Sequence, residues 1–223
     1  GWSCITRSTT LTVGDVVGDL LAEAGLASWE YDVSALTDVI HGYALADVRT
    51  IREAIEDLQA AYLFDLVQND WRLIAVPRGG AVAATLDENY LAAHQAGSEC
   101  PDRIVYTRIR ETELPSDLRF GYVDLDRTYE PNVQTAKRIL DHATTTADIS
   151  VPIAMDADDA ATAATKLLYA AWANRGEIEL TASFRYLKLI PTDVISVTVD
   201  SITYTIRIEK MDFSTDGLLK ISG

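Results

Sequence analysis

The sequence predicts an α+β fold, in which an N-terminal module of two helices and a β-hairpin precedes a small antiparallel β-barrel or sandwich with one packed helix. Two observations support this prediction. Apolar residues recur at helical spacing in three segments, and short runs of β-branched and aromatic residues, bounded by turn residues, fill much of the rest. With 48% apolar and 24% charged residues, the chain has a globular composition and enough apolar side chains to fill real cores.

The first helix is predicted over residues 12–25. Thr12 and Asp15 stand at the two positions of a capping box, and Gly25 suits the left-handed conformation that ends a helix. A second helix is expected to begin after Asp47, its N-cap. The inner face of this second helix is expected to comprise Val48, Ile51, Ile55, Leu58 and Tyr62.

A β-hairpin is predicted after the second helix. Residues 63–67 and 71–76 are apolar-rich runs, and the three residues between them favour a turn. Trp71 is expected to face the core. These elements make residues 1–82 an α+β module, and residues 83–100, where no periodicity persists, are expected to form a linker.

Residues 101–223 are predicted to form the barrel-like domain. Residues 103–111 and 118–125 are expected to pair as strands across a turn at Pro115. An alanine-rich helix is predicted over 156–175, with Trp172 facing a core. Four further strands are expected at 178–184, 194–199, 202–209 and 218–221, with tight turns at Asp200-Ser201 and Asp216-Gly217.

The stretch Phe120 to Ile139, FGYVDLDRTYEPNVQTAKRI, resembles the baseplate-hub or tail-tip proteins of bacteriophages, prophages and gene transfer agents. The helix-helix-hairpin pattern and a second run from Leu189 to Ile195 agree with this resemblance, which covers most of the chain. Thr192 stands where the family more often has Gly, so the second turn is expected to differ in shape. The signature residues are Asp124, Asp126, Tyr129, Pro131, Gln134 and Ala136 in the first run, and Pro191 and Asp193 in the second.

The resemblance implies a structural virion protein without enzymatic activity or cofactor. It implies a trimeric hub at the tail tip, made in the bacterial cytoplasm, that joins the tail tube to distal tail, fibre or spike proteins and surrounds a passage for DNA. The signature is then structural: Asp124 and Asp126 are expected to bond their own turn, Tyr129 to pack, and Pro131 to direct the chain onward. For a ring subunit, Trp29 and Tyr31 are the expected interface residues.

Charge and composition exclude some classes of protein. Because 34 acidic residues outnumber 19 basic ones, the formal charge is −15, and sequence-specific binding of nucleic acid is not expected. An acidic channel wall would instead keep passing DNA from adhering. No apolar run approaches the roughly 20 residues of a membrane helix, so no membrane insertion is expected. Without an initiator Met, the chain looks like an excised piece, and Cys4 and Cys100 are expected to be reduced.

Three other functions remain open on the residues alone. Asp124, Asp126, Thr128 and Glu130 alternate like calcium ligands, although Tyr129 replaces the glycine of an EF-hand loop and Thr135 its final glutamate. Glu111 and Glu113 are the nearest candidates for the carboxylate pair of a tail-associated glycoside hydrolase. An exposed aromatic platform would favour a module that binds host carbohydrate. The three histidines, His41, His94 and His142, lack metal-ligand spacing.

Overall fold

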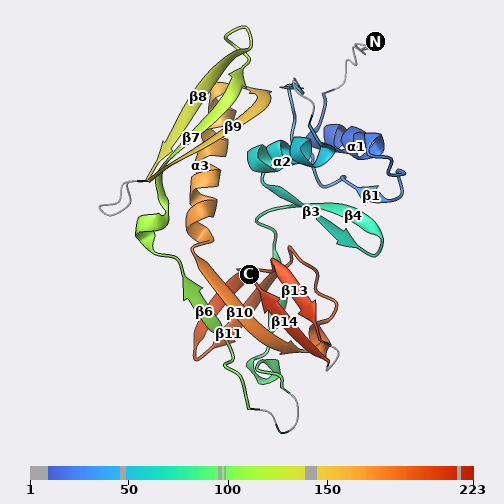
Figure 1. Cartoon of the computed structure of the whole chain (residues 1–223), viewed down its shortest axis with the longest axis vertical. Coiled ribbons are helices and arrows are strands. Elements are labelled where there is room, and N and C mark those ends of the chain that lie inside the picture. The colour runs from blue at the N-terminus through green and yellow to red at the C-terminus, as the bar shows by residue number, and fades with distance from the viewer. Residues whose placement is uncertain (1–9, 46–48, 95–96, 98, 139–144, 215–216) are drawn as a thin grey trace. The chain divides into compact units, whose positions relative to one another are not determined.

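The structure is a computed structural model that describes residues 10–45, 49–94, 97, 99–138, 145–214 and 217–223. The fold is mixed α+β, with three α-helices among the described residues and sheets that stay open rather than closing into a barrel (Figure 1). The chain divides into two units, each made from two separate stretches. Unit 1 comprises Gly1–Pro77 and Pro115–Ala171, and unit 2 comprises Arg78–Leu114 and Trp172–Gly223.

Helix α1 (Val13–Glu23) of unit 1 begins and ends where the sequence predicts. The Thr12 hydroxyl accepts a hydrogen bond from the Asp15 N–H at 3.1 Å, and the Asp15 carboxylate accepts one from the Thr12 N–H at 2.9 Å. At the other end Gly25 has a φ of 93°, and its N–H donates to the Ala22 carbonyl. Local capping therefore fixes both ends of this helix.

Helix α2 (Ile51–Tyr62) has Thr50 as its N-cap, so the prediction of Asp47 is wrong. Thr50 and Glu53 form a complete capping box, in which the Thr50 N–H donates to the Glu53 carboxylate at 2.8 Å. A box satisfies two helix donors where a single aspartate satisfies one, which explains the later start. Asp47 and Val48 lie outside the described residues. The helix contacts α1 and buries Ala54, Ile55, Leu58 and Ala61.

A three-stranded sheet follows, in which β4 (Arg72–Pro77) lies between β3 (Phe64–Asn69) and the short parallel strand β1 (Tyr31–Asp32). Asp70 and Trp71 form the two-residue turn of the hairpin, with φ values of 49° and 67°. Trp71 is 84% exposed, so the expectation that it faces the core is wrong. Its place at the hairpin tip, beyond the last paired residues, leaves it in solvent.

A four-stranded sheet completes unit 1, with the order β2-β9-β7-β8. The predicted pairing of 103–111 with 118–125 is wrong, because β7 pairs with β8 and, in parallel, with β9, whereas β6 pairs with β10 in unit 2. Even-numbered residues of β7 are all buried, so the sheet gives this strand one inner and one outer face. The strands are β2 (Gly42–Tyr43), β7 (Pro115–Asp124), β8 (Glu130–Lys137) and β9 (Thr145–Met155).

Helix α3 (Ala157–Ala173) follows β9 directly, and Asp156 accepts a hydrogen bond from the Asp159 N–H at its start. The helix lies in unit 1 up to Ala171. It is therefore not packed with the sheets of unit 2, although the predicted barrel-like domain placed it with those strands. Trp172 is buried, as predicted. The apolar face of α3 within unit 1 consists of Ala160, Ala163, Ala164 and Leu168.

Unit 2 contains two sheets, with the orders β13-β14-β10-β6 and β12-β11-β5. Both contribute to one apolar core, which includes Leu180, Ile195 and Leu219, so the sandwich alternative describes this unit better than a barrel. Strand β5 pairs in parallel with β11, so the unit is not wholly antiparallel. The strands are β5 (Val82–Leu86), β6 (Val105–Arg108), β10 (Gly176–Ser183), β11 (Val194–Val199), β12 (Ile202–Arg207), β13 (Lys210–Phe213) and β14 (Leu218–Ser222).

The division into units differs from the predicted modules of 1–82 and 101–223. Strand β5 and the short helix η1 (Glu88–Tyr90) occupy the first part of the stretch expected to be a linker, and β5 joins a strand more than 100 residues away. Two further single-turn helices, η2 (Glu111–Glu113) and η3 (Phe184–Tyr186), complete unit 2. Long-range strand pairing, which leaves no local mark in the sequence, is the reason for the difference.

Candidate assembly interface

The first signature run folds as the tip of the β7–β8 hairpin, where Asp124 acts as a buried clamp. Its side chain is only 5% exposed; Oδ2 accepts a hydrogen bond from Asn132 Nδ2 at 2.8 Å, and Oδ1 accepts one from the Asp126 N–H at 3.0 Å. The Arg127 guanidinium lies 3.8 Å away. The hydrogen bond from Asn132, with smaller contributions from the Asp126 N–H and Arg127, holds the pKa of Asp124 below its ordinary value of 3.8. The clamp is therefore ionised at neutral pH.

The other signature residues of this run take different places on the hairpin. Asp126 is exposed, and Pro131 is an exposed residue of the edge strand β8, opposite Val123. Gln134 and Ala136 face inward opposite Phe120 and Leu118.

The expectation that Tyr129 packs against other residues is wrong. It is 64% exposed with a φ of 61°, and its N–H donates to the Asp124 carbonyl at 3.0 Å. Thr128, just before it, has a φ of 56°. The clamp holds the backbone of the loop and leaves the Tyr129 ring in solvent.

The second signature run forms a tight turn in unit 2. Pro191 and Thr192 occupy its two central positions, and the Asp193 N–H donates to the Ile190 carbonyl at 3.1 Å. Thr192 has a φ of 80°, so the backbone takes the conformation that glycine favours although the residue is threonine. The Asp193 carboxylate accepts a hydrogen bond from the Ile190 N–H, which ties the turn to the start of β11.

Unit 1 also presents two exposed tryptophans, which we call the tryptophan patch: Trp29, 64% exposed, and Trp71. Strands β1 and β4 run in parallel with Tyr31 opposite Leu73, and Trp29 and Trp71 each lie in a turn two residues before this pair. The Leu73 N–H donates to the Glu30 carbonyl at 2.8 Å, which extends the pairing toward the patch. Tyr31 is half-buried instead, and its ring lies 3.6 Å from the place a Cβ on Gly18 would occupy.

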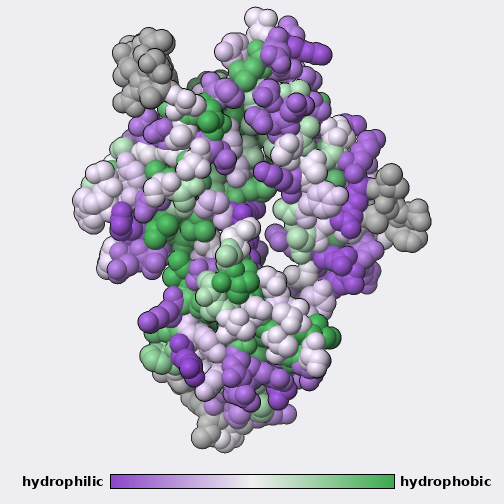
Figure 2. All heavy atoms as spheres, turned by 180° about the vertical axis from the view of Figure 1, so that it is seen from behind, coloured by the Kyte–Doolittle hydropathy of each residue, from purple (hydrophilic) through white to green (hydrophobic). Residues whose placement is uncertain are grey.

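Sequence reasoning missed Trp71 as a surface residue. The turn predicted at residues 68–70 lies too early, because the strands pair as far as Asn69 and Arg72 and leave Asp70 and Trp71 as the turn. Hydrophobic residues also appear in patches among hydrophilic ones on the face shown in Figure 2. Trp2 lies outside the described residues.

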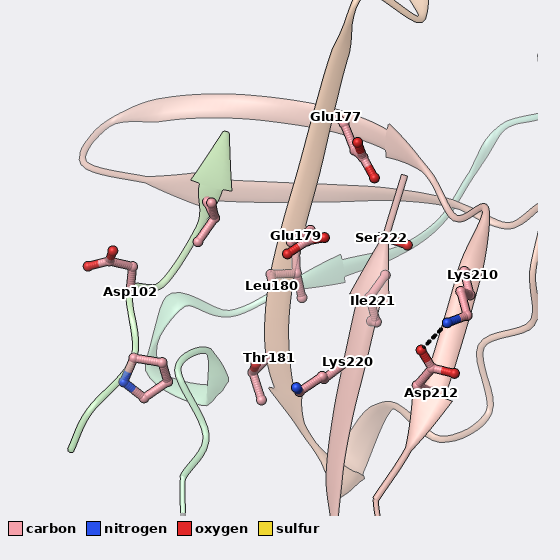
Figure 3. Close-up of a pocket in the computed structure, with 12 residues that line it drawn as sticks. Asp102, Glu177, Glu179, Leu180, Thr181, Lys210, Asp212, Lys220, Ile221 and Ser222 are labelled. Atoms are coloured by element: carbon pink, nitrogen blue, oxygen red, sulfur yellow. Dashed lines mark ion pairs between the residues drawn. The ribbon is translucent and has the colours of Figure 1, made fainter. Parts of the chain in front are cut away.

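A shallow hollow of about 430 Å³ lies on the outer face of the β13-β14-β10-β6 sheet (Figure 3). Glu177 and Glu179 reach it from β10, Lys220 from β14, and Lys210 pairs with Asp212 across 2.6 Å on β13. Such an alternation of opposite charges is typical of the solvated face of a sheet.

The candidate carboxylates and histidines lie elsewhere. Glu111 pairs with Arg108 at 2.5 Å and Arg175 at 3.4 Å, and Glu113 is exposed beside it, away from the hollow. His94 bonds the Ala92 carbonyl, His41 is exposed, and His142 lies outside the described residues.

Neither a metal centre nor a membrane-spanning helix occurs among the described residues. Where the chain is described, no group of three or more His, Cys, Asp or Glu side chains is placed to hold a metal ion. None of the described helices has the length and apolar character needed to cross a membrane.

Comparisons with known proteins give a consistent picture. A chain of the virion of a native gene transfer agent particle matches with a TM-score of 0.86 and 23% identity, over 100% of this chain and 49% of that one, so this chain spans about half the length of that relative. A tail protein from Neisseria meningitidis MC58 matches with a TM-score of 0.62 and 13% identity, over 96% and 68% of the two chains. The 43 kDa tail protein of prophage MuSo2 from Shewanella oneidensis matches with a TM-score of 0.59 and 14% identity, over 96% of this chain and 66% of that one.

At these identities the solved structures establish a shared fold. No curated protein sequence matches the chain. The model of a protein family described as putative phage tail protein matches residues 50–211, well over half of the chain. The chain therefore belongs to the family of putative phage tail proteins.

Proposed function

We propose that this protein is a structural subunit of a phage-like tail tip, a baseplate hub that joins the tail tube to fibres or spike. The observation that carries the proposal is the family match over residues 50–211, and the fold shared with a chain of a gene transfer agent virion supports it. The protein acts through the surfaces it presents to its neighbours. These are further copies of itself in a trimer, the tail tube, and distal tail and fibre proteins.

The same proposal gives the acidic charge a role. A hub surrounds the passage of DNA, and phosphates are repelled by a surface rich in carboxylates. Unit 1 contains 21 acidic and 9 basic residues, a formal charge of −12, whereas unit 2 contains 13 and 10, a charge of −3. We therefore assign the wall of the passage to unit 1.

The signature residues have a scaffolding role in this proposal. Asp124, Asp126 and Pro131 shape the hairpin tip, and Gln134 and Ala136 lie on its inner side. Pro191 and Asp193 set the turn before β11. These residues hold surfaces in place and do not act on a substrate.

In this proposal the interface with neighbouring subunits includes Trp29 and Tyr31, and we add Trp71 because it is exposed. Large aromatic side chains are enriched at the centres of protein interfaces because they bury much area at a low entropic cost. Trp29 and Trp71 present their rings to solvent. Tyr31, half-buried against α1, begins strand β1 two residues after Trp29.

Labelling of purified particles tests this function. The full-length protein carries an epitope tag, and gold-labelled antibody is located on the particles by negative-stain electron microscopy. We expect the label at the tail tip. Label on the capsid, or particles that assemble and infect without the protein, would contradict a hub role.

A further inference from the structure

Strand β6 of unit 2 has one edge without a partner among the described residues. It is the last strand of the sheet β13-β14-β10-β6 and pairs with β10 alone (Figure 1). The Ile109 N–H donates to the Arg175 carbonyl at 2.8 Å, which continues the register of this pair. Because backbone groups alternate in direction along an antiparallel strand, the N–H and C=O groups of Tyr106 and Arg108 point away from β10, toward the open edge.

This edge lacks the features that commonly protect an open strand. Such edges are often blocked by proline, by a charged residue in the strand or by a bulge. In unit 1, for example, the edge strand β8 contains Pro131, which has no N–H to donate. The centre of β6, Val105-Tyr106-Thr107, has no proline, glycine or charged residue, and its pairing with β10 is regular. The backbone of β6 can therefore accept a further strand.

The side chains of β6 are also left in solvent. All four residues of the strand are exposed, and the exposed fractions of Val105, Tyr106 and Ile109 are 47%, 52% and 44%. Tyr106 faces the core side of the sheet, where its ring centroid lies 6.4 Å from that of Tyr204. Its ring also lies against Gly176, since a Cβ on that glycine would be 2.6 Å from it. An added strand would bury apolar surface that unit 2 alone leaves in water.

Carboxylates lie on the outer face beside this edge. Val105 and Thr107 are opposite Glu179 and Glu177 of β10 in register, and Asp102 precedes the strand. The three carboxylates line the hollow of about 430 Å³ together with Val105 (Figure 3). None of them forms a hydrogen bond or ion pair with another residue in the part of the chain that the structure describes.

The cations near this edge do not neutralise those carboxylates. Lys210 already belongs to an ion pair, so Lys220 is the one ammonium group left for them among the described residues that line the hollow. Arg103 and Arg108 each pair with a glutamate of their own unit, and Arg110 lies two residues past the end of β6. The negative excess favours a partner with basic side chains. It disfavours a second copy of this chain, which carries −15 itself.

We propose that an extended, basic segment of another tail protein adds to the open edge of β6 as a fifth strand of this sheet. Backbone hydrogen bonds to Tyr106 and Arg108 supply affinity, and alternating side chains supply specificity. Apolar side chains of the segment cover Tyr106 on the core side, and Lys or Arg side chains on the outer side reach toward Glu177 and Glu179. The inference rests on the proposed function, because it specifies one contact between the hub and a neighbouring protein of the tail.

Two synthetic peptides test this chemistry on the purified protein. One alternates Lys and Val and the other Glu and Val, and each has about eight residues, enough to form a strand. Fluorescence anisotropy at low ionic strength should show the Lys-Val peptide binding at least about 10-fold more tightly than the Glu-Val peptide. Equal binding of the two peptides, or no binding of the Lys-Val peptide, would overturn the proposal.

A proline substitution separates strand addition from general attraction to an acidic protein. Tyr106→Pro removes an N–H that β10 does not use and leaves the charge unchanged, so it should weaken binding of the Lys-Val peptide by about 10-fold or more. Tyr106→Ala keeps that N–H and should lose less. Lys-Val binding that is the same in Tyr106→Pro and wild type would show that the edge is not used.

A charge variant keeps the test decisive if the proline disturbs the fold. The double variant Glu177→Gln and Glu179→Gln should weaken binding of the Lys-Val peptide by about 5-fold or more and leave that of the Glu-Val peptide no weaker. Circular dichroism and melting temperatures establish that each variant is folded. Undiminished binding of the Lys-Val peptide to the folded double variant would remove the role of the carboxylates, and the proposal with it.

Photocrosslinking in assembled particles identifies the protein that supplies the strand. A benzophenone amino acid replaces Tyr106 in the full-length protein, and a matched variant carries it at Phe184, which is 56% exposed on η3. We expect the Tyr106 position to crosslink to another tail protein, within an extended segment that contains Lys or Arg. Crosslinks between copies of this protein, no crosslink, or an equal yield from position 184 would overturn the proposal.

The outcomes also separate this inference from the proposed function. Gold label at the tail tip without a crosslink from position 106 removes the strand addition and leaves the hub role intact. Absence of the protein from particles removes the hub role itself.

Discussion

The two units bury their cores in different ways. In unit 2, residues of two sheets meet in one apolar core, and the buried polar or charged residues among those described, Ser116 and Asp124, both belong to unit 1. In unit 1, helices cover one part of the sheets, and the core reaches up to a buried carboxylate, Asp124, at the tip of a hairpin. The units also differ in charge, −12 against −3. The stability of unit 1 therefore depends on a buried carboxylate, and hence on pH, in addition to the packing of apolar side chains.

The largest expected effect comes from removing a large buried side chain from the core of unit 1. Phe120 on β7 is fully buried, so Phe120→Ala should lower the free energy of unfolding of unit 1 by about 3–5 kcal/mol. Hydrogen exchange followed by mass spectrometry should show faster exchange in unit 1 while β10, β11 and β14 of unit 2 stay protected. The exposed Phe184 supplies the control, since Phe184→Ala should change stability by about 0.5 kcal/mol or less. Equal loss of protection in both units would show that they unfold as one body.

The second largest effect concerns the pH dependence of stability, which is expected for unit 1 because of Asp124. In the variant Asp124→Asn, one acceptor oxygen becomes an amide NH2 group, which faces another hydrogen-bond donor. The melting temperature at pH 7 should therefore fall by several degrees. Because the pKa of Asp124 is lowered in the folded protein, its stabilisation is complete well above pH 3.8 and is lost as the pH falls through the lowered value. The difference between wild type and variant should therefore shrink in acid. Asp126→Asn, at an exposed position, is the control, and an equal effect from it would contradict the clamp.

A smaller effect of opposite sign is expected in unit 2. Thr192→Gly should raise stability by about 1 kcal/mol, because glycine adopts a φ of 80° without the steric cost that a β-branched residue bears. The variant also removes a buried hydroxyl that has no hydrogen-bond partner among the described residues. Denaturant unfolding measures the gain, and Thr192→Ala, which keeps the Cβ, should recover less of it. A loss of stability on changing Thr192 to Gly would contradict this account of the turn.

The smallest effects compare one turn from each unit. Asp70-Trp71 and Asp200-Ser201 share nearly the same left-handed conformation, with φ values of 49° and 67° against 50° and 68°. Trp71→Gly and Ser201→Gly should therefore each stabilise the protein by about 0.5 kcal/mol. Only Trp71→Gly should also weaken self-association in sedimentation experiments. If it instead destabilises the isolated chain, the Trp71 ring packs within its own unit.

Local patterns in the sequence predicted local structure well. The capping box at Thr12 and Asp15 and the glycine at position 25 marked both ends of α1, because these signals act within one turn of helix. The turn at Asp200-Ser201 was likewise predicted from two residues. Strands β8 and β9 were missed, since β8 has few β-branched residues and both depend on pairing with β7.

The candidate surfaces were predicted less well than the helices. The expectation that Asp124 bonds its own turn is confirmed by its contact with the Asp126 N–H. The expectations for Tyr129 and Trp71 were wrong, because both were judged by their apolar character and both lie at hairpin tips. Hydrophobicity measures what a side chain gains from burial, and a hairpin tip offers it nothing to pack against within the chain.

The sequence by itself determined the class of fold, the ends of α1, the turn chemistry and the resemblance to tail proteins, all of which depend on residues close together in the chain. Only the tertiary structure decided that β5 pairs with β11 and β7 with β9, and hence that each unit is built from two separate stretches. It also decided which aromatic rings remain in solvent. The reason is physical: strand pairing and burial depend on segments that meet in space, and the free energy they supply belongs to no single stretch of sequence.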